Sequence, residues 1–102
     1  MRWYWANFIG SADFDVVSLA APSRAPLKEL AGLPPLYMNA AGLDCLRDDT
    51  PLLSLRLSEA GVGHRMDVIP GIVHGFQQMS AELPAARMAQ KTAGEWLATR
   101  FA

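Results

Sequence analysis

The stretch "LYMNAAGLDCLRDDTPLLSLRLSEAGVGHRMDVIPGIVHGF", residues 36–76, decides the fold. Its first run, residues 36–42, follows Pro-Pro, is mostly apolar and ends in a glycine, which predicts a short buried strand. Residues 64–70 alternate, with Met66 and Val68 on one side, and predict a second strand. A helical pattern separates the two runs, so the expected order is strand, helix, strand.

The helix between the strands has boundary signals at both ends. Thr50 offers an N-cap oxygen, and Pro51 fits the first helical position, where a missing N–H costs nothing. Gly61 would end the helix. Its apolar face comprises Leu53, Leu57 and Ala60. Two strands joined by such a crossover helix are expected to pair in parallel within an α/β sheet.

The flanking segments extend this pattern. Residues 82–101 predict a long helix, and residues 1–9 predict a short one. Between that short helix and the first strand, residues 10–35 hold repeated proline and glycine and predict mostly irregular connection. The expected buried face of the long helix comprises Ala85, Ala89, Ala93, Trp96 and Leu97.

The chain, residues 1–102, is expected to form one partial domain. A helical and irregular cover segment, 1–35, would precede a β-α-β-α part, 36–102. A two-stranded parallel sheet leaves two open edges and is not a viable fold alone. We therefore expect the chain to be one flank of a larger α/β sheet.

Composition and charge exclude several classes of function. Nine basic and ten acidic residues give a net charge of −1, which does not fit a nucleic-acid or anionic-membrane partner. The single cysteine, Cys45, excludes an intrachain disulfide and a cysteine-based zinc site, and it suits a cytoplasmic location. No apolar run approaches the roughly 20 residues that a membrane span needs.

Two side chains follow the predicted strands at the edge where ligands gather in parallel sheets. Asp44 follows the first strand and His74 the second. A carboxylate that accepts an imidazole N–H would fix the tautomer, as in the acid–histidine half of a nucleophilic triad. The pattern alone leaves other roles open, because His74 also fits a loop histidine bound to a backbone carbonyl, and Asp44 an Asx turn.

The sequence motifs around these two residues add a family resemblance. "AGLPPLYMNAAGLDCLRDD" and "LRLSEAGVGHRMDVIPGIVHGF" resemble the C-terminal part of α/β-hydrolases of the hormone-sensitive-lipase-like esterase family. The resemblance implies that Asp44 in "DCLRD" is the triad acid and that His74 in "PGIVHGF" is the triad histidine. It implies hydrolysis of small to medium acyl esters without metal or cofactor. It also implies that Ile72, Val73, Trp3 and Trp5 lie near the substrate pocket.

The sequence departs from the family pattern in three ways. The 102 residues contain no G-x-S-x-G nucleophile motif and no His-Gly-Gly-type oxyanion loop, which the family carries upstream. Gly42 stands where an acid is frequent and is expected to loosen the loop that aims Asp44. Cys45 replaces a proline; a small buried thiol is favoured over a nucleophile for it. His64, after a Gly-Val-Gly turn, is expected to be exposed.

Two hypotheses about function remain. In the first, the chain is the C-terminal part of a serine esterase, and the serine and the oxyanion donors come from another chain or an upstream part. In the second, it is an inactive remnant that serves as a structural or interaction module. None of the serines sits on a strand-to-helix turn, so the isolated chain is expected to be inactive or nearly so. Open sheet edges and the aromatic start also predict self-association.

Overall fold

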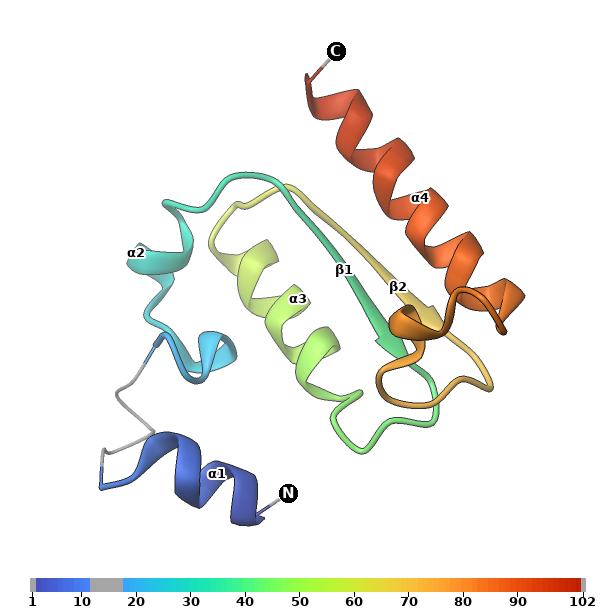
Figure 1. Cartoon of the computed structure of the whole chain (residues 1–102). Helices are drawn as coiled ribbons and strands as arrows, with labels where there is room; N and C mark the ends of the chain where they lie inside the picture. The colour runs from blue at the N-terminus through green and yellow to red at the C-terminus, as the bar shows by residue number, and fades with distance from the viewer. Residues whose placement is uncertain (1, 12–17, 102) are drawn as a thin grey trace.

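The computed structural model describes residues 2–11 and 18–101 (Figure 1). Met1, residues 12–17 of the predicted irregular segment, and Ala102 lie outside the described residues. In chain order the elements are α1 (Arg2–Ile9), the 3-10 helix η1 (Pro22–Arg24), α2 (Leu27–Leu30), β1 (Leu36–Ala41), α3 (Asp49–Glu59), β2 (His64–Ile69), the 3-10 helix η2 (Phe76–Met79) and α4 (Pro84–Phe101).

The two strands form a parallel pair with α3 as the crossover between them. The register runs from Leu36 opposite His64 to Ala41 opposite Ile69. In Figure 1, α3 lies along one side of this pair and α4 along the other. The predicted α/β order of strand, helix, strand and helix is therefore confirmed.

Each face of the sheet has its own small apolar cluster, because successive strand residues point to opposite faces. On the α3 side, Leu57 is fully buried, and the partly buried Leu53 and Met38 pack against its cluster. On the α4 side, Phe76 is buried with Ala41, and α4 contributes Ala86 and Ala89 to that cluster. The predicted apolar face of α3 is confirmed, since Ala60 also packs against its cluster.

The start of α3 differs from the sequence prediction. The helix begins at Asp49, and Asp48 is its N-cap residue, so Thr50 is not the cap. The reason is that the preceding loop already turns: Asp49 N–H donates to Leu46 O at 3.2 Å, and Thr50 N–H donates to Arg47 O at 3.3 Å. These turns lead directly into the helix and bring its start forward.

Burial along α4 and β2 also differs from expectation. Ala86, not Ala85, is fully buried on α4, and Leu97 is 50% exposed. Val68 on β2 is 42% exposed although it was expected to share a covered face with Met66. With only two strands, the described part of the chain offers too little surface to cover these apolar side chains.

Within residues 2–11 and 18–101, no helix combines the length and the apolar character needed to cross a membrane.

Candidate active site

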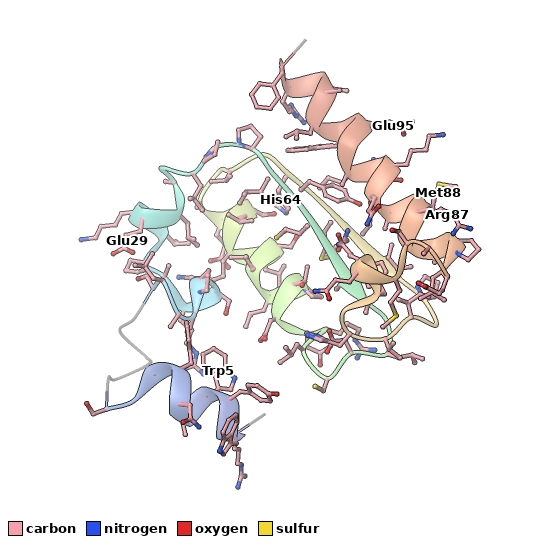
Figure 2. The ribbon with its side chains drawn as sticks, in the orientation of Figure 1. Trp5, Glu29, His64, Arg87, Met88 and Glu95 are labelled. Carbon is pink, nitrogen blue, oxygen red and sulfur yellow. The ribbon has the colours of Figure 1, made fainter. Side chains whose placement is uncertain are left out.

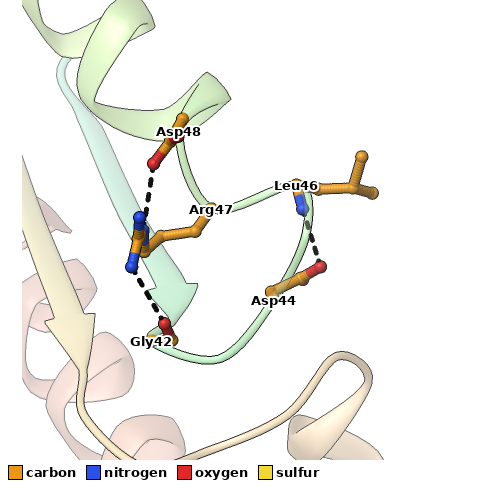
Figure 3. A network of polar contacts seen from close by, with 5 residues as sticks. All are labelled: Gly42, Asp44, Leu46, Arg47 and Asp48. Atoms are coloured by element: carbon orange, nitrogen blue, oxygen red, sulfur yellow. Dashed lines mark hydrogen bonds and ion pairs between the residues drawn. The ribbon is translucent and has the colours of Figure 1, made fainter.

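The loop after β1 is shaped by Asp44. Its Oδ1 accepts the backbone N–H of Leu46 at 2.9 Å, which closes an Asx turn (Figure 3). Its Oδ2 is left for His74, whose Nδ1 lies 2.7 Å away. The two roles considered for Asp44 are therefore compatible, because each uses a different oxygen of one carboxylate.

Gly42 does not loosen this loop, contrary to the sequence expectation. Its N–H donates to Ile69 O at 2.7 Å, which extends the strand ladder by one bond. Its carbonyl accepts from Arg47 Nη1 at 3.2 Å (Figure 3). A Cβ at this position would lie 2.8 Å from Ile69 O, closer than real Cβ contacts. Glycine is therefore required for the close approach of the two strand ends.

His74 lies in the loop after β2, between two glycines with left-handed backbone. Gly71 has φ of 70° and Gly75 has φ of 75°, a region that other residues rarely adopt. Phe76, immediately after Gly75, is buried in the cluster under α4 and anchors the loop. The two loops thus meet beyond the carboxyl ends of β1 and β2, where the parallel topology brings them together.

The lowered pKa of Asp44 decides which of the two side chains carries the hydrogen of their contact. The Leu46 N–H and the His74 imidazole hold the pKa of the Asp44 carboxyl below its usual value. An ionised carboxylate accepts only, so the hydrogen of the contact is carried by His74 Nδ1. Among the described residues no contact engages His74 Nε2, and the side chain of His74 is 71% exposed while that of Asp44 is 12% exposed. This arrangement can take a proton at Nε2 while the acid holds the ring.

An open hollow of about 240 Å³ contains the pair, and Thr50, Phe76 and Gln77 are among its lining residues. None of the four residues suggested for a substrate pocket lines it. Ile72 packs against the cluster under α4, Val73 is half exposed, and Trp3 is 69% exposed on α1.

A larger hollow of about 940 Å³ lies between α1 and the start of α3. Trp5 lines it from the side of α1 that faces η1 (Figure 2). Leu53 of α3 lines it as well, and Thr50 borders both hollows. The acid–histidine pair is therefore next to the larger hollow but not inside it.

The second histidine forms a contact that the sequence pattern did not indicate. His64 Nε2 lies 2.7 Å from Ser54 Oγ, and Nδ1 lies 2.9 Å from Val62 O. His64 is the first residue of β2; it is half-buried where it faces Ser54 of α3, and not exposed as expected (Figure 2). Since β2 rises roughly 3.3 Å per residue, its start lies on the order of 17 Å from its end. Ser54 is bound at the start of β2 and His74 lies beyond its end, so Ser54 cannot be the nucleophile from which His74 takes a proton.

The remaining groups that could carry chemistry are the thiol of Cys45 and possible metal ligands. Cys45 is exposed, which corrects the expectation of a buried thiol. Within the part of the chain that the structure describes, no group of three or more His, Cys, Asp or Glu residues could hold a metal ion.

Comparison with known proteins places these features in a family. A family model described as alpha/beta hydrolase fold matches residues 1–78. Carboxylesterase NlhH of Mycobacterium tuberculosis is 33% identical over 86 residues, which cover 84% of this chain and 26% of that protein. Human hormone-sensitive lipase is 33% identical over 69 residues, 68% of this chain and 6% of the lipase.

Solved structures are similar as well. A thermostable esterase from Pseudomonas putida superposes with a TM-score of 0.83 at 31% identity, covering 92% of this chain and 30% of the esterase. A hormone-sensitive lipase from a metagenome library superposes with a TM-score of 0.84 at 26% identity, covering 93% and 31%. The chain spans about a quarter of the length of the bacterial esterases it matches in sequence.

Proposed function

Since the chain belongs to the alpha/beta hydrolase fold family, we propose that it supplies the acid and the histidine of a serine carboxylic-ester hydrolase. The observation that carries this proposal is the 2.7 Å contact between Asp44 Oδ2 and His74 Nδ1. The similarity to proteins named carboxylesterase and esterase supports ester bonds as the substrate class. The partial coverage of these relatives fits a C-terminal portion of such an enzyme.

In the proposed reaction, a serine from outside these 102 residues attacks the ester carbonyl. His74 Nε2 takes the serine proton as general base and returns a proton to the leaving alcohol. Asp44 keeps the imidazole in the productive tautomer and stabilises the imidazolium that forms. The donors that stabilise the oxyanion also come from outside the chain. The acyl ester is small to medium in size, and the hollow that Trp5 lines is next to the pair.

Completion of the sheet would come from an upstream hydrolase part or from a second copy of this chain. In the described residues the sheet is β1 paired with β2 alone, so β1 has an edge without a strand partner. Trp3 and Phe8 on α1 are 69% and 71% exposed, which favours association. A monomeric mass in light scattering at tens of micromolar would count against self-association. A cytoplasmic location stays a prediction from the single cysteine.

Complementation in trans tests the proposed function. The chain is co-expressed with the upstream part of the Pseudomonas putida esterase, from which the segment that superposes on this chain has been removed. Turnover of p-nitrophenyl butyrate is expected from the pair and not from either part alone. His74→Ala should abolish it, while His64→Gln, the matched control, should leave it. Full activity of the His74→Ala pair would refute the proposed role.

The alternative is an inactive remnant that serves as an interaction module. One observation favours it: among the described serines, the one bound to a histidine is Ser54, which lies at the far end of β2 from His74. Under this alternative the two parts would associate and yet remain without turnover.

A further inference from the structure

Three side-chain amides hold the loop that carries His74. Gln77, three residues after His74, donates from Nε2 to Asn39 Oδ1 at 2.5 Å. Gln90 of α4 donates from Nε2 to the backbone carbonyl of Gln77 at 2.7 Å. The contacts therefore join β1, η2 and α4 at one point, directly beside the acid–histidine pair.

Asn39 is a polar residue in a strand that is otherwise mostly apolar. It lies near the middle of β1 and shares a face with Ala41, which packs under Phe76. Asparagine is depleted in strands, and a half-buried amide costs free energy unless it is hydrogen-bonded. An apolar residue here would extend the cluster under α4, so packing alone does not account for the amide. Its hydrogen bond to Gln77 does.

His74 itself has little to hold it in place. Its side chain is 71% exposed, and Asp44 is its hydrogen-bond partner. The loop runs between Gly71 and Gly75, whose backbone is adaptable. Phe76 anchors the loop by packing, which is not directional. The Gln77–Asn39 bond, by contrast, is directional, and it joins η2 to β1.

We propose that Asn39, Gln77 and Gln90 act together as positioning residues that keep His74 on Asp44. Asn39 and Gln77 line the same hollow as the pair, so the contact lies at the site and not behind it. The role rests on the proposed function, because positioning matters only if the Asp44–His74 pair acts. None of the three amides carries charge, so they act through geometry.

The test uses the 102-residue chain and reads the tautomer of its two histidines. Nitrogen-15 shifts of labelled imidazoles, measured at alkaline pH, give the ratio of Nδ1–H to Nε2–H forms. Gln77→Leu and Asn39→Leu are each expected to lower this ratio for His74 about fivefold, the effect of losing one ordinary hydrogen bond. Because both remove the same bond, the double variant should fall no further than either single variant.

Controls separate positioning from general damage. Gln78→Leu changes the exposed neighbour and should leave the ratio as in wild type. Asn39→Asp keeps an oxygen acceptor for Gln77 and should restore it. His64, bound to Val62 O and Ser54, reports in every sample that the fold is intact. If Gln77→Leu disturbs His64, Gln77→Ser repeats the test without adding apolar surface.

The outcomes are distinct. An unchanged His74 ratio in Gln77→Leu and Asn39→Leu, with a lowered ratio in Asp44→Ala, overturns the positioning role and leaves the proposed function standing. A ratio that Asp44→Ala also leaves unchanged overturns both, because the pair itself would not exist in solution.

Discussion

Replacing Gly42 by alanine should destabilise the fold. The added Cβ would lie 2.8 Å from Ile69 O, 3.1 Å from Pro70 Cα and 3.4 Å from Gly71 N. All three are backbone atoms, so no flexible side chain can move aside. The ends of β1 and β2 must separate by several tenths of an ångström, and the Gly42 N–H bond to Ile69 O is stretched.

The size of the effect follows from these two losses. Overpacking costs about 1–3 kcal/mol, and the weakened hydrogen bond adds about 1 kcal/mol. We expect the free energy of unfolding to fall by about 2–4 kcal/mol, and Tm by about 10 °C or more for a domain of this size. The Arg47 contact to the Gly42 carbonyl should move with it and displace Asp44.

Urea and thermal denaturation measure the change, with Gly94→Ala as the matched control. Gly94 lies in α4 with nothing within 4 Å of an added Cβ, so alanine should raise the free energy of unfolding by about 0.5–1 kcal/mol. The two substitutions add the same methyl group and should act with opposite signs. A Gly42→Ala chain as stable as wild type would refute the close-approach argument.

Two further predictions concern stability. Leu57→Ala should lower the free energy of unfolding by about 2–5 kcal/mol, because Leu57 is fully buried. Leu55→Ala, at a 64% exposed position, should change it by less than about 0.5 kcal/mol. Equal urea midpoints for the two variants would contradict the cluster on the α3 side. The pKa of Asp44 is lowered in the folded chain from its usual 3.8, so the stability that this carboxylate contributes is complete above that value and is lost as the pH falls through the lower, folded pKa. Asp44→Asn should remove this part of the acid dependence of the urea midpoint, and an unchanged acid limb in that variant would show that the carboxylate has no favourable partners.

The sequence predicted the order of elements because the periodicity of each segment is local. Pro-Pro and glycine mark the start and end of the first strand, and the face of Leu53 and Leu57 follows from helical spacing. The approach of Asp44 and His74 was also predictable, because parallel strands bring their carboxyl ends to one edge. The observed contact of 2.7 Å agrees with that topology, while the catalytic role remains a proposal.

Other features depend on tertiary contacts that no local pattern encodes. Gly42 was expected to be loose, yet its conformation is imposed by a neighbouring strand twenty-seven residues later in the chain, at Ile69. The partner of His64 is Ser54. Helical spacing alone does not indicate that the face of α3 that carries Ser54 turns toward the start of β2. Asn39 did leave a signal, since an amide within a strand of apolar residues calls for a hydrogen-bond partner. The identity of that partner, Gln77, required the structure.

The most direct test of the central claim is a single-chain chimera. This chain replaces the segment of the Pseudomonas putida esterase on which it superposes, and kcat for p-nitrophenyl butyrate is measured for the chimera and for its His74→Ala and Asp44→Asn variants. If Asp44 and His74 are the acid and base of the triad, the chimera turns over and both variants lose on the order of 10⁴-fold in kcat. A chimera that folds and hydrolyses the ester equally well with alanine at position 74 would contradict the account.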